Sequence, residues 1–331
     1  SDETSPDGGF FVPLEYPVLT DSQINAIAMK NPNQAVAEIL NLFFGTELNR
    51  WDIDFYAGRY PVRLNHIVRR IAIAEMWHNC DWEFSRTVRD LAALVRGVRD
   101  TDLPIGTWFR VALRIGVLFG IFGELMRDGI AAPDKKVDIA VPSGDGTALA
   151  AAWFARKMGL PVGEIICCCN ENSGVWDLVN RGQMKLSAKV VPTMPPKCDM
   201  VVPQALELLI RDKLEWDDGE EFLQQQKKGA TYYLSPEEFR HFRYGLTASV
   251  VGDNRVRMAI PNLYNTNGYI LCPYSALVYT GLMDYRSHPG PRRAALMLTD
   301  YDPRDCADTV IHALAISDQE LKEWCQIGSA G

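Results

Sequence analysis

The chain has 331 residues, of which 47% are hydrophobic, 23% charged and 10% aromatic. This composition is typical of a globular protein with one large or two modest domains, and it excludes a disordered or fibrous chain. The net charge of −8 at pH 7 provides no overall basic field that would attract phosphate backbones or anionic lipids. We therefore expect neither nucleic acid nor a membrane as a partner.

The cysteines and the most apolar segment bear on the cellular location. Of the eight cysteines, three are consecutive at 167–169, and no two show the spacing of a structural zinc site. Free thiols in a reducing compartment are the simplest interpretation, so we expect a cytoplasmic protein. Residues 1–9 do not resemble a signal peptide, and the apolar stretch 111–126 is too short to span a membrane.

The first part of the chain is predicted to be mostly helical. In chain order, the expected helices begin near Ser22, with Thr20 or Asp21 as the cap, and cover residues 34–44, 82–98 and 107–127. Between them, residues 66–74 alternate as a strand does, although a helix that starts earlier also fits.

A change of pattern after residue 136 predicts a parallel sheet. A strand over 137–141, a glycine turn, a helix over 148–158 and a strand over 164–169 form one βαβ unit. The remaining expected elements are a helix over 202–210, a charged surface segment over 213–229, a helix capped by Ser235, a strand over 294–298 and a helix over 305–316.

The turn inside this unit, Ser143-Gly-Asp-Gly-Thr147, is the sharpest chemical feature of the chain. Its glycines allow a tight turn, and the N–H groups at the helix start, with the hydroxyls of Ser143 and Thr147, form a cradle for an anion. The alternative is a tight strand-to-helix turn that binds no ligand, because a glycine loop alone is weak evidence.

The sequence around this turn matches motifs of a known family in the same order. The matching segments are Asp7-Gly-Gly-Phe-Phe-Val-Pro13, Asp138-Ile-Ala-Val-Pro-Ser-Gly-Asp-Gly-Thr147, Ala155-Arg-Lys-Met-Gly-Leu-Pro161, Ile165–Asn172 and Ala295-Leu-Met-Leu-Thr-Asp-Tyr-Asp-Pro303. They resemble threonine synthase, a fold-type II pyridoxal-phosphate enzyme, whose corresponding motifs include Pro-Ser/Thr-Gly-Asn-Phe-Gly and Lys-Lys-Met-Gly-Leu-Pro. The resemblance covers most of the chain and is denser after residue 104.

The resemblance implies an α/β fold. We expect a threonine-synthase-like large domain, similar to the β subunit of tryptophan synthase, with a parallel-rich sheet and a reduced small domain. The expected division is an N-terminal helical segment over 1–65, a remnant of the small domain over 66–103 and the large domain over 104–331.

The chain departs from the family where the family does its chemistry. The family's Phe-Lys-Asp motif supplies the lysine of the internal aldimine, but this chain has no lysine between Lys30 and Lys135. The family's Ser/Thr-Gly-Asp-Thr-Gly substrate loop is also absent, so a block holding both features is expected to be deleted. Without the lysine amine, covalent anchoring of the cofactor is not available.

The resemblance still implies a ligand site near the turn. The expected cofactor-binding residues are Ser143, Gly144, Asp145, Gly146, Thr147, Asn170, Thr299 and Asp300. The expected ligand is pyridoxal phosphate held without a covalent bond, or another phosphorylated or amino-acid small molecule. Asp145 opposes this, because its negative charge beside a phosphate costs about 1 kcal/mol or more unless the carboxylate turns away. Asp300, with Thr299 beside it, aligns with the family's position near the pyridine nitrogen.

Replacement chemistry is predicted around Glu75, His78 and Asp81, which occupy the place in chain order of the missing block. We expect at least one of them to line the cleft near Ser143 or Asp300 and to transfer protons. Glu75 and His78 have the Glu-x-x-His spacing found in some metal sites, which suggests a metal site as a further hypothesis. This hypothesis is weak, because short motifs of this kind often occur without a metal. The structural alternative is a polar turn between a strand and a helix.

Three classes of function remain open. The first is a divergent pyridoxal-phosphate or phospho-ligand enzyme of amino-acid metabolism, a lyase of this superfamily with altered chemistry. The second is a pseudoenzyme that binds a metabolite or a partner. The third is an enzyme with new chemistry around Glu75, His78 and Asp81. A homo-oligomer is compatible with each class, and fold analogy cannot choose among them.

Overall fold

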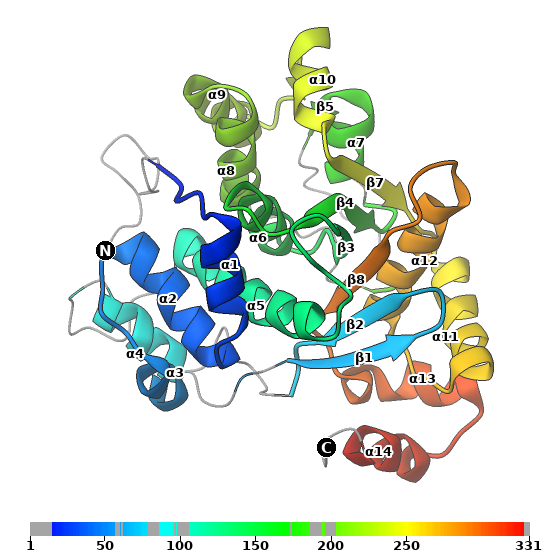
Figure 1. Cartoon of the computed structure of the whole chain (residues 1–331). Helices are drawn as coiled ribbons and strands as arrows, with labels where there is room; N and C mark the ends of the chain where they lie inside the picture. The colour runs from blue at the N-terminus through cyan, green and yellow to red at the C-terminus, as the bar shows by residue number, and fades with distance from the viewer. Residues whose placement is uncertain are drawn as a thin grey trace.

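The computed structural model describes residues 15–56, 60, 62–78, 86–95, 97, 106–172, 174–185, 193–195 and 203–327. At its centre is a six-stranded sheet in the order β1-β2-β8-β3-β4-β7, which has helices on both faces (Figure 1). The strands are β1 (Arg63–Ile67), β2 (Ile71–Glu75), β3 (Val137–Pro142), β4 (Val162–Cys169), β7 (Leu246–Val250) and β8 (Ala294–Thr299). All neighbouring pairs are parallel except β1 with β2.

Fourteen helices are present in the described part of the chain. They are α1 (Asp21–Ala28), α2 (Pro32–Phe44), α3 (Arg50–Tyr56), α4 (Arg86–Val95), α5 (Thr107–Arg127), α6 (Thr147–Lys157), α7 (Gly174–Arg181), α8 (Pro203–Lys213), α9 (Trp216–Lys227), α10 (Pro236–Arg243), α11 (Asp253–Asn267), α12 (Pro273–Ser287), α13 (Ala307–Leu314) and α14 (Asp318–Ile327). A short 3-10 helix, η1 (Pro303–Cys306), and a two-stranded sheet of β5 (Gln183–Met184) and β6 (Tyr232–Tyr233) complete the described elements.

The sheet separates two apolar layers. Alternate residues of a strand point to opposite faces, so Ala72 and Ala74 pack on the layer of α2, α5 and α6. Ile71 and Ile73 pack on the layer of α11 and α12. Consequently, each residue at the end of a strand can be assigned to one layer by counting along the strand.

Helix α5 is buried along almost its whole length. It packs against α1, α2 and α6, and apolar residues occupy most of its circumference, as expected for a helix inside a core. Glycines allow the closest contacts: a Cβ added to Gly123 would lie 2.7 Å from the carbonyl oxygen of Ala28. Among the described residues, no helix is long and apolar enough to cross a membrane.

Several sequence predictions are confirmed and one is wrong. The βαβ unit at 137–169, the Thr20 cap and the Ser235 cap form as predicted. Residues 66–74 are not one strand, because Val68–Arg70 form a turn that makes an antiparallel hairpin of β1 and β2. Most of residues 213–229 are exposed or half-buried, as predicted for a charged surface segment, and within them Glu215 and Asp218 form a capping box that starts α9.

The hairpin has a consequence for the predicted domains. The predicted boundary between residues 65 and 66 falls inside β1, and β2 pairs directly with β8 of the large domain. The hairpin therefore extends the main sheet. Of the helix predicted over 82–98, residues 86–95 are helical as α4, while 79–85 lie outside the described residues.

Candidate functional site

Most of the predicted site residues lie along one edge of the sheet. Because β2, β8, β3 and β4 are parallel neighbours, their carboxyl ends meet at the same edge. Glu75, Thr299, Ser143 and Asn170 lie at or directly after these ends. Ligands of open α/β sheets bind at this kind of edge, so the topology brings the predicted residues together.

The glycine turn has the geometry that the sequence predicts. Gly144 and Gly146 adopt φ values of 46° and 85°, in the left-handed region that glycine tolerates best. The Ser143 N–H bonds to Cys168 of the neighbouring strand at 2.9 Å, and the Gly146 N–H bonds to the Ser143 carbonyl at 2.8 Å. Helix α6 therefore begins at Thr147, directly after the turn.

Asp145 places its carboxylate inside this turn. Its Oδ1 accepts hydrogen bonds from the Thr147 N–H at 2.9 Å and from the Thr147 hydroxyl at 2.6 Å, and its Oδ2 pairs with Arg110. Burial alone would raise the pKa of Asp145, but the guanidinium groups of Arg114 and Arg110 and the Thr147 hydrogen bonds outweigh burial and lower it. The carboxylate is thus stabilised as an anion and accepts the N–H that the cradle would offer to a ligand.

Two arginines of α5 complete a cluster of alternating charge. Arg114 donates to both carboxylate oxygens of Asp300, at 3.3 and 3.1 Å, while Arg110 pairs with Asp145 one turn earlier on the helix. The side chain of Arg114 is 10% exposed and that of its partner Asp300 is 29% exposed. The side chain of Arg110 is 14% exposed and that of its partner Asp145 is 28% exposed. We call Arg110, Arg114, Asp145 and Asp300 the ion-pair cluster.

Sequence reasoning missed both arginines. The signal that would have found them is two cations four residues apart in the apolar first half of α5, where a buried charge needs a partner.

Asn170 and Thr299 differ in how their polar groups are used. Asn170 donates to the Thr193 hydroxyl at 2.7 Å and to the Pro195 carbonyl at 3.1 Å, so its amide holds neighbouring backbone. The Thr299 hydroxyl is buried, with the residue 1% exposed, and has no hydrogen-bond partner in the described part of the chain. A buried hydroxyl without a partner is rare, and it marks a place for a ligand atom or a water molecule.

Glu75 and His78 form a buried network at the same edge. One oxygen of the Glu75 carboxylate lies 2.7 Å from His78 Nε2, and the other accepts a hydrogen bond from the Tyr269 hydroxyl at 2.6 Å. Like Ile71 and Ile73, Glu75 points to the α11 and α12 layer. The network is therefore separated by the sheet from the Arg114–Asp300 pair on the α5 layer.

Asp81, the third predicted catalytic residue, lies outside the described residues. The sequence repeats the Glu-x-x-His spacing at Glu238 and His241, where Glu238 accepts the Ser235 N–H as a helix cap. No group of three or more potential metal ligands occurs among the residues that the structure describes.

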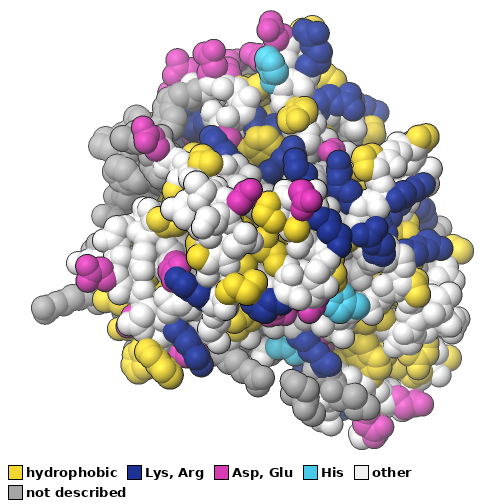
Figure 2. Space-filling model, in the orientation of Figure 1, with side chains coloured by type: hydrophobic (Ala, Val, Ile, Leu, Met, Phe, Trp, Pro, Cys, Tyr) yellow, Lys and Arg dark blue, Asp and Glu magenta, His cyan; other side chains and the backbone are white. Residues whose placement is uncertain are grey.

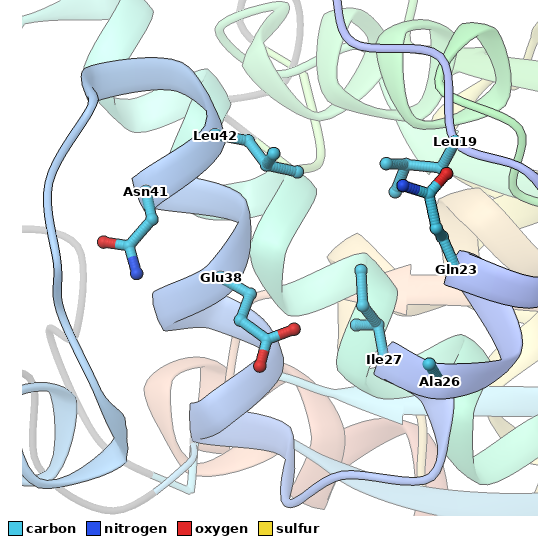
Figure 3. Close-up of a pocket in the computed structure, with 7 residues that line it drawn as sticks. All are labelled: Leu19, Gln23, Ala26, Ile27, Glu38, Asn41 and Leu42. Carbon is cyan, nitrogen blue, oxygen red and sulfur yellow. The ribbon is translucent and has the colours of Figure 1, made fainter.

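A separate groove lies between α1 and α2 (Figure 3). It has a volume of about 390 Å³ and is lined mainly by apolar side chains, with Glu38 and Asn41 from α2. Glu38 pairs with Lys30 at 2.5 Å, and Asn41 holds the backbone of Leu48. Because these polar groups are used within the protein, the groove offers no chemistry comparable to the edge of the sheet.

The residues present do not fit the phosphate of pyridoxal phosphate at the turn. Asp145 holds the Thr147 N–H and adds a negative charge where a phosphate would bind. The cation that contacts the turn is Arg110, and a guanidinium stays protonated and forms no imine. Among the described residues, the Thr299 hydroxyl is one buried polar group that offers a hydrogen bond to a cofactor atom.

Comparison with curated proteins finds relatives of one kind, although no family model matches the chain. The chain is 27% identical over 173 residues to threonine synthase-like 2 of Pongo abelii, which covers 51% of this chain and 35% of that protein. It is 25% identical over 177 residues to threonine synthase-like 1 of Homo sapiens, covering 51% and 23%. It is also 25% identical over 216 residues to threonine synthase of Pseudomonas aeruginosa, covering 63% and 44%. The matches thus span less than half of each relative.

Solved structures match over more of the chain. The crystal structure of threonine synthase from yeast superposes with a TM-score of 0.81 at 17% identity, covering 97% of this chain and 89% of that one. The structure of pyridoxal-phosphate-bound threonine synthase from Brucella melitensis gives 0.76 at 17% identity, covering 95% and 87%. At this identity the likeness shows the fold, and it confirms the predicted α/β class.

Proposed function

Because the chain is a divergent relative of the threonine synthase-like proteins, we propose that it serves amino-acid metabolism by binding a free amino acid without lysine-imine chemistry. The ion-pair cluster carries this proposal. Arg110 and Arg114 are about 6 Å apart along the axis of α5. Each faces a carboxylate that is more exposed than itself.

A zwitterion matches such a cluster. The α-carboxylate of an amino acid would replace a protein carboxylate on an arginine, and its ammonium group would be held by Asp145 or Asp300. Arginine binds carboxylates through paired N–H groups, which supplies the orientation. The exchange turns the two ion pairs of the cluster into three, so neither charge of the ligand is left unpaired in the partly buried site.

The test compares three forms of the same ligand. Each free L-amino acid is measured by calorimetry beside its amide, which lacks the carboxylate, and its N-acetyl derivative, which lacks the ammonium group. We expect binding of at least one zwitterion and of neither derivative. The variant Arg114→Gln/Asp300→Asn should abolish binding, while Arg181→Gln, which breaks an exposed pair on α7, should not. Equal binding of the derivatives, or of the double variant, would contradict the proposal.

A second candidate is non-covalent binding of pyridoxal phosphate or another phosphorylated small molecule at residues 143–147. The observation in its favour is the unpaired Thr299 hydroxyl, which offers a hydrogen bond to a heteroatom at the same edge of the sheet. Counting along β8, however, assigns the Thr299 side chain to the α11 and α12 layer, whereas the turn lies on the α5 and α6 layer. Asp145 opposes it, since a phosphate must displace the carboxylate from Thr147. Titration with pyridoxal phosphate and with inorganic phosphate distinguishes the candidates: saturable micromolar binding of either one by the unaltered protein would favour this second function.

A further inference from the structure

The opposite edge of the sheet carries a concentration of positive charge. Three segments meet at the amino ends of β2 and β8: the turn Val68–Arg70, the end of α12 and the loop 288–293. They contribute Arg69, Arg70, Arg286, Arg292 and Arg293, which we call the arginine surface. Figure 2 shows Lys and Arg side chains gathered on the right of this view, in a protein whose net charge is −8.

The positive charge of this surface is largely unbalanced. Arg293 pairs with Asp138 at 3.2 Å. Arg286 instead donates to the backbone carbonyls of Arg69 and Arg293, at 2.7 and 2.8 Å, and Arg292 donates to the carbonyl of Arg286. Among the described residues, no carboxylate pairs with Arg69, Arg70, Arg286 or Arg292.

The arginines are close enough to repel one another. Burial lowers the pKa of Arg286, and the neighbouring Arg292, Arg70 and Arg69 lower it further, against the opposing effect of Asp138. Like charges held together in this way destabilise the folded protein. The hydrogen bonds of Arg286 and Arg292 to backbone carbonyls account for those two side chains but do not require arginine at positions 69 and 70.

The turn itself adds a second unfavourable feature. Arg69 and Arg70 have φ values of 64° and 58°, in the left-handed region where glycine and asparagine are preferred. Both residues are exposed. The turn's bonds to Arg286 and to the Ala295 N–H use backbone carbonyls, which any residue provides. The side-chain hydrogen bond of Arg69 goes to the weak acceptor Sδ of Met283, at 3.3 Å. Strained residues that packing does not require are characteristic of functional surfaces.

We propose that the arginine surface docks a short acidic segment of a partner protein. Guanidinium groups match carboxylates through paired N–H donors, which suits Asp and Glu side chains. DNA or an anionic membrane would extend past the arginine surface, and there the net charge of −8 of the protein would repel it. At physiological salt, screening limits electrostatic attraction to about 8 Å. A short acidic segment that lies directly on the arginine surface therefore experiences most of the available attraction.

The test measures binding of a fluorescein-labelled octaglutamate peptide by anisotropy. The variant Arg69→Asn/Arg70→Gly removes two positive charges. It also places asparagine and glycine, which tolerate the left-handed backbone conformation, at the two turn positions. We expect this variant to lose about tenfold or more in affinity while its melting temperature is unchanged or higher. The matched control, Arg240→Gln/Arg243→Gln on α10, removes the same charge elsewhere and should retain binding.

Three results would overturn the proposal. These are no saturable peptide binding, equal binding by the turn variant, or tighter binding of a short DNA duplex or of phosphatidylserine vesicles than of the peptide. The inference does not depend on the proposed amino-acid site. The turn variant should bind a free amino acid as the unaltered protein does, so failure of one proposal leaves the other standing.

Discussion

At the scale of single residues, Asp145 decides what the glycine turn can bind. The residue types at 143–147 predict an anion cradle, and the fold forms it, but the chain supplies the anion itself. Sequence separation explains why this was not predicted. Arg110 lies 35 residues from Asp145, and Arg114 lies 186 residues from Asp300. Neither pairing leaves a local pattern, whereas a strand, a glycine turn and a helix do.

Asp145→Asn should open the cradle to phosphate. The amide removes the negative charge but keeps an oxygen that can accept the Thr147 N–H, so the turn should persist. We expect phosphate and pyridoxal phosphate to bind about tenfold or more tightly, because two like charges at contact distance repel by about 1 to 4 kcal/mol. Isothermal titration checks this, with the exposed Asp134→Asn as the control. Unchanged phosphate affinity would show that the carboxylate does not occupy the anion position.

The same residue gives a prediction for pH. The folded-state pKa of Asp145 lies below its ordinary value of 3.8. Its contribution to the free energy of unfolding is therefore complete above pH 3.8 and is lost as the pH falls through the folded-state pKa. Between pH 5 and 2 in chemical denaturation series, the unaltered protein should lose more stability than Asp145→Asn. Parallel curves would contradict the ionised, paired state.

At the scale of elements, the buried faces explain which predictions succeeded. Helix α5 and the βαβ unit have strong local patterns, so they were predicted. Strand β7 and helices α11 and α12 were not predicted. The buried faces of α11 and α12 are defined by their packing on the sheet, and β7 by its pairing with β4. The hairpin was missed because two arginines occupy a turn where sequence rules expect glycine or asparagine.

The close approach of α5 and α1 depends on Gly123. An added Cβ would lie 2.7 Å from a backbone oxygen of Ala28, which cannot move as a flexible side chain can. Gly123→Ala should therefore lower the free energy of unfolding by about 1 to 2 kcal/mol, although alanine favours helix by about 1 kcal/mol. Gly290→Ala, where an added Cβ meets nothing within 4 Å, is the control in urea denaturation. A stabilised Gly123→Ala would contradict the packing.

The Glu75 network can be tested for a structural role. Tyr269→Phe removes a hydrogen bond from a carboxylate that is 3% exposed, so the free energy of unfolding should fall by about 1 to 3 kcal/mol. Glu75→Gln in the same background should recover part of this, because a neutral amide is cheaper to bury. If His78→Ala keeps full stability but changes ligand binding, the predicted functional role of His78 gains support instead.

At the scale of the whole molecule, the fold matches that of solved threonine synthases, while residues 31–134 contain no lysine. The family resemblance predicted the sheet and its ligand edge, since those depend on motifs dispersed over most of the chain. It could not predict the two arginines at this edge, because they come from α5 and are recognisable only once α5 lies against the turn.

Protein purified in the presence of pyridoxal phosphate should contain no internal aldimine. Treatment with borohydride should leave every lysine peptide at its unmodified mass, since the cation at the glycine turn is Arg110. Mass spectrometry of the digested protein checks this. A pyridoxyl-lysine adduct at stoichiometric yield would contradict it.

The three consecutive cysteines of β4 make the two layers of the molecule separately observable. All three are buried, and as neighbours on one strand they alternate between faces. Cys167 and Cys169 lie in the α5 and α6 layer, whereas Cys168 packs against Gly281 of α12. A thiol reagent can reach each sulfur only after the helices above it have separated from the sheet. The order in which the three thiols become labelled during slow denaturation therefore reports which layer opens first.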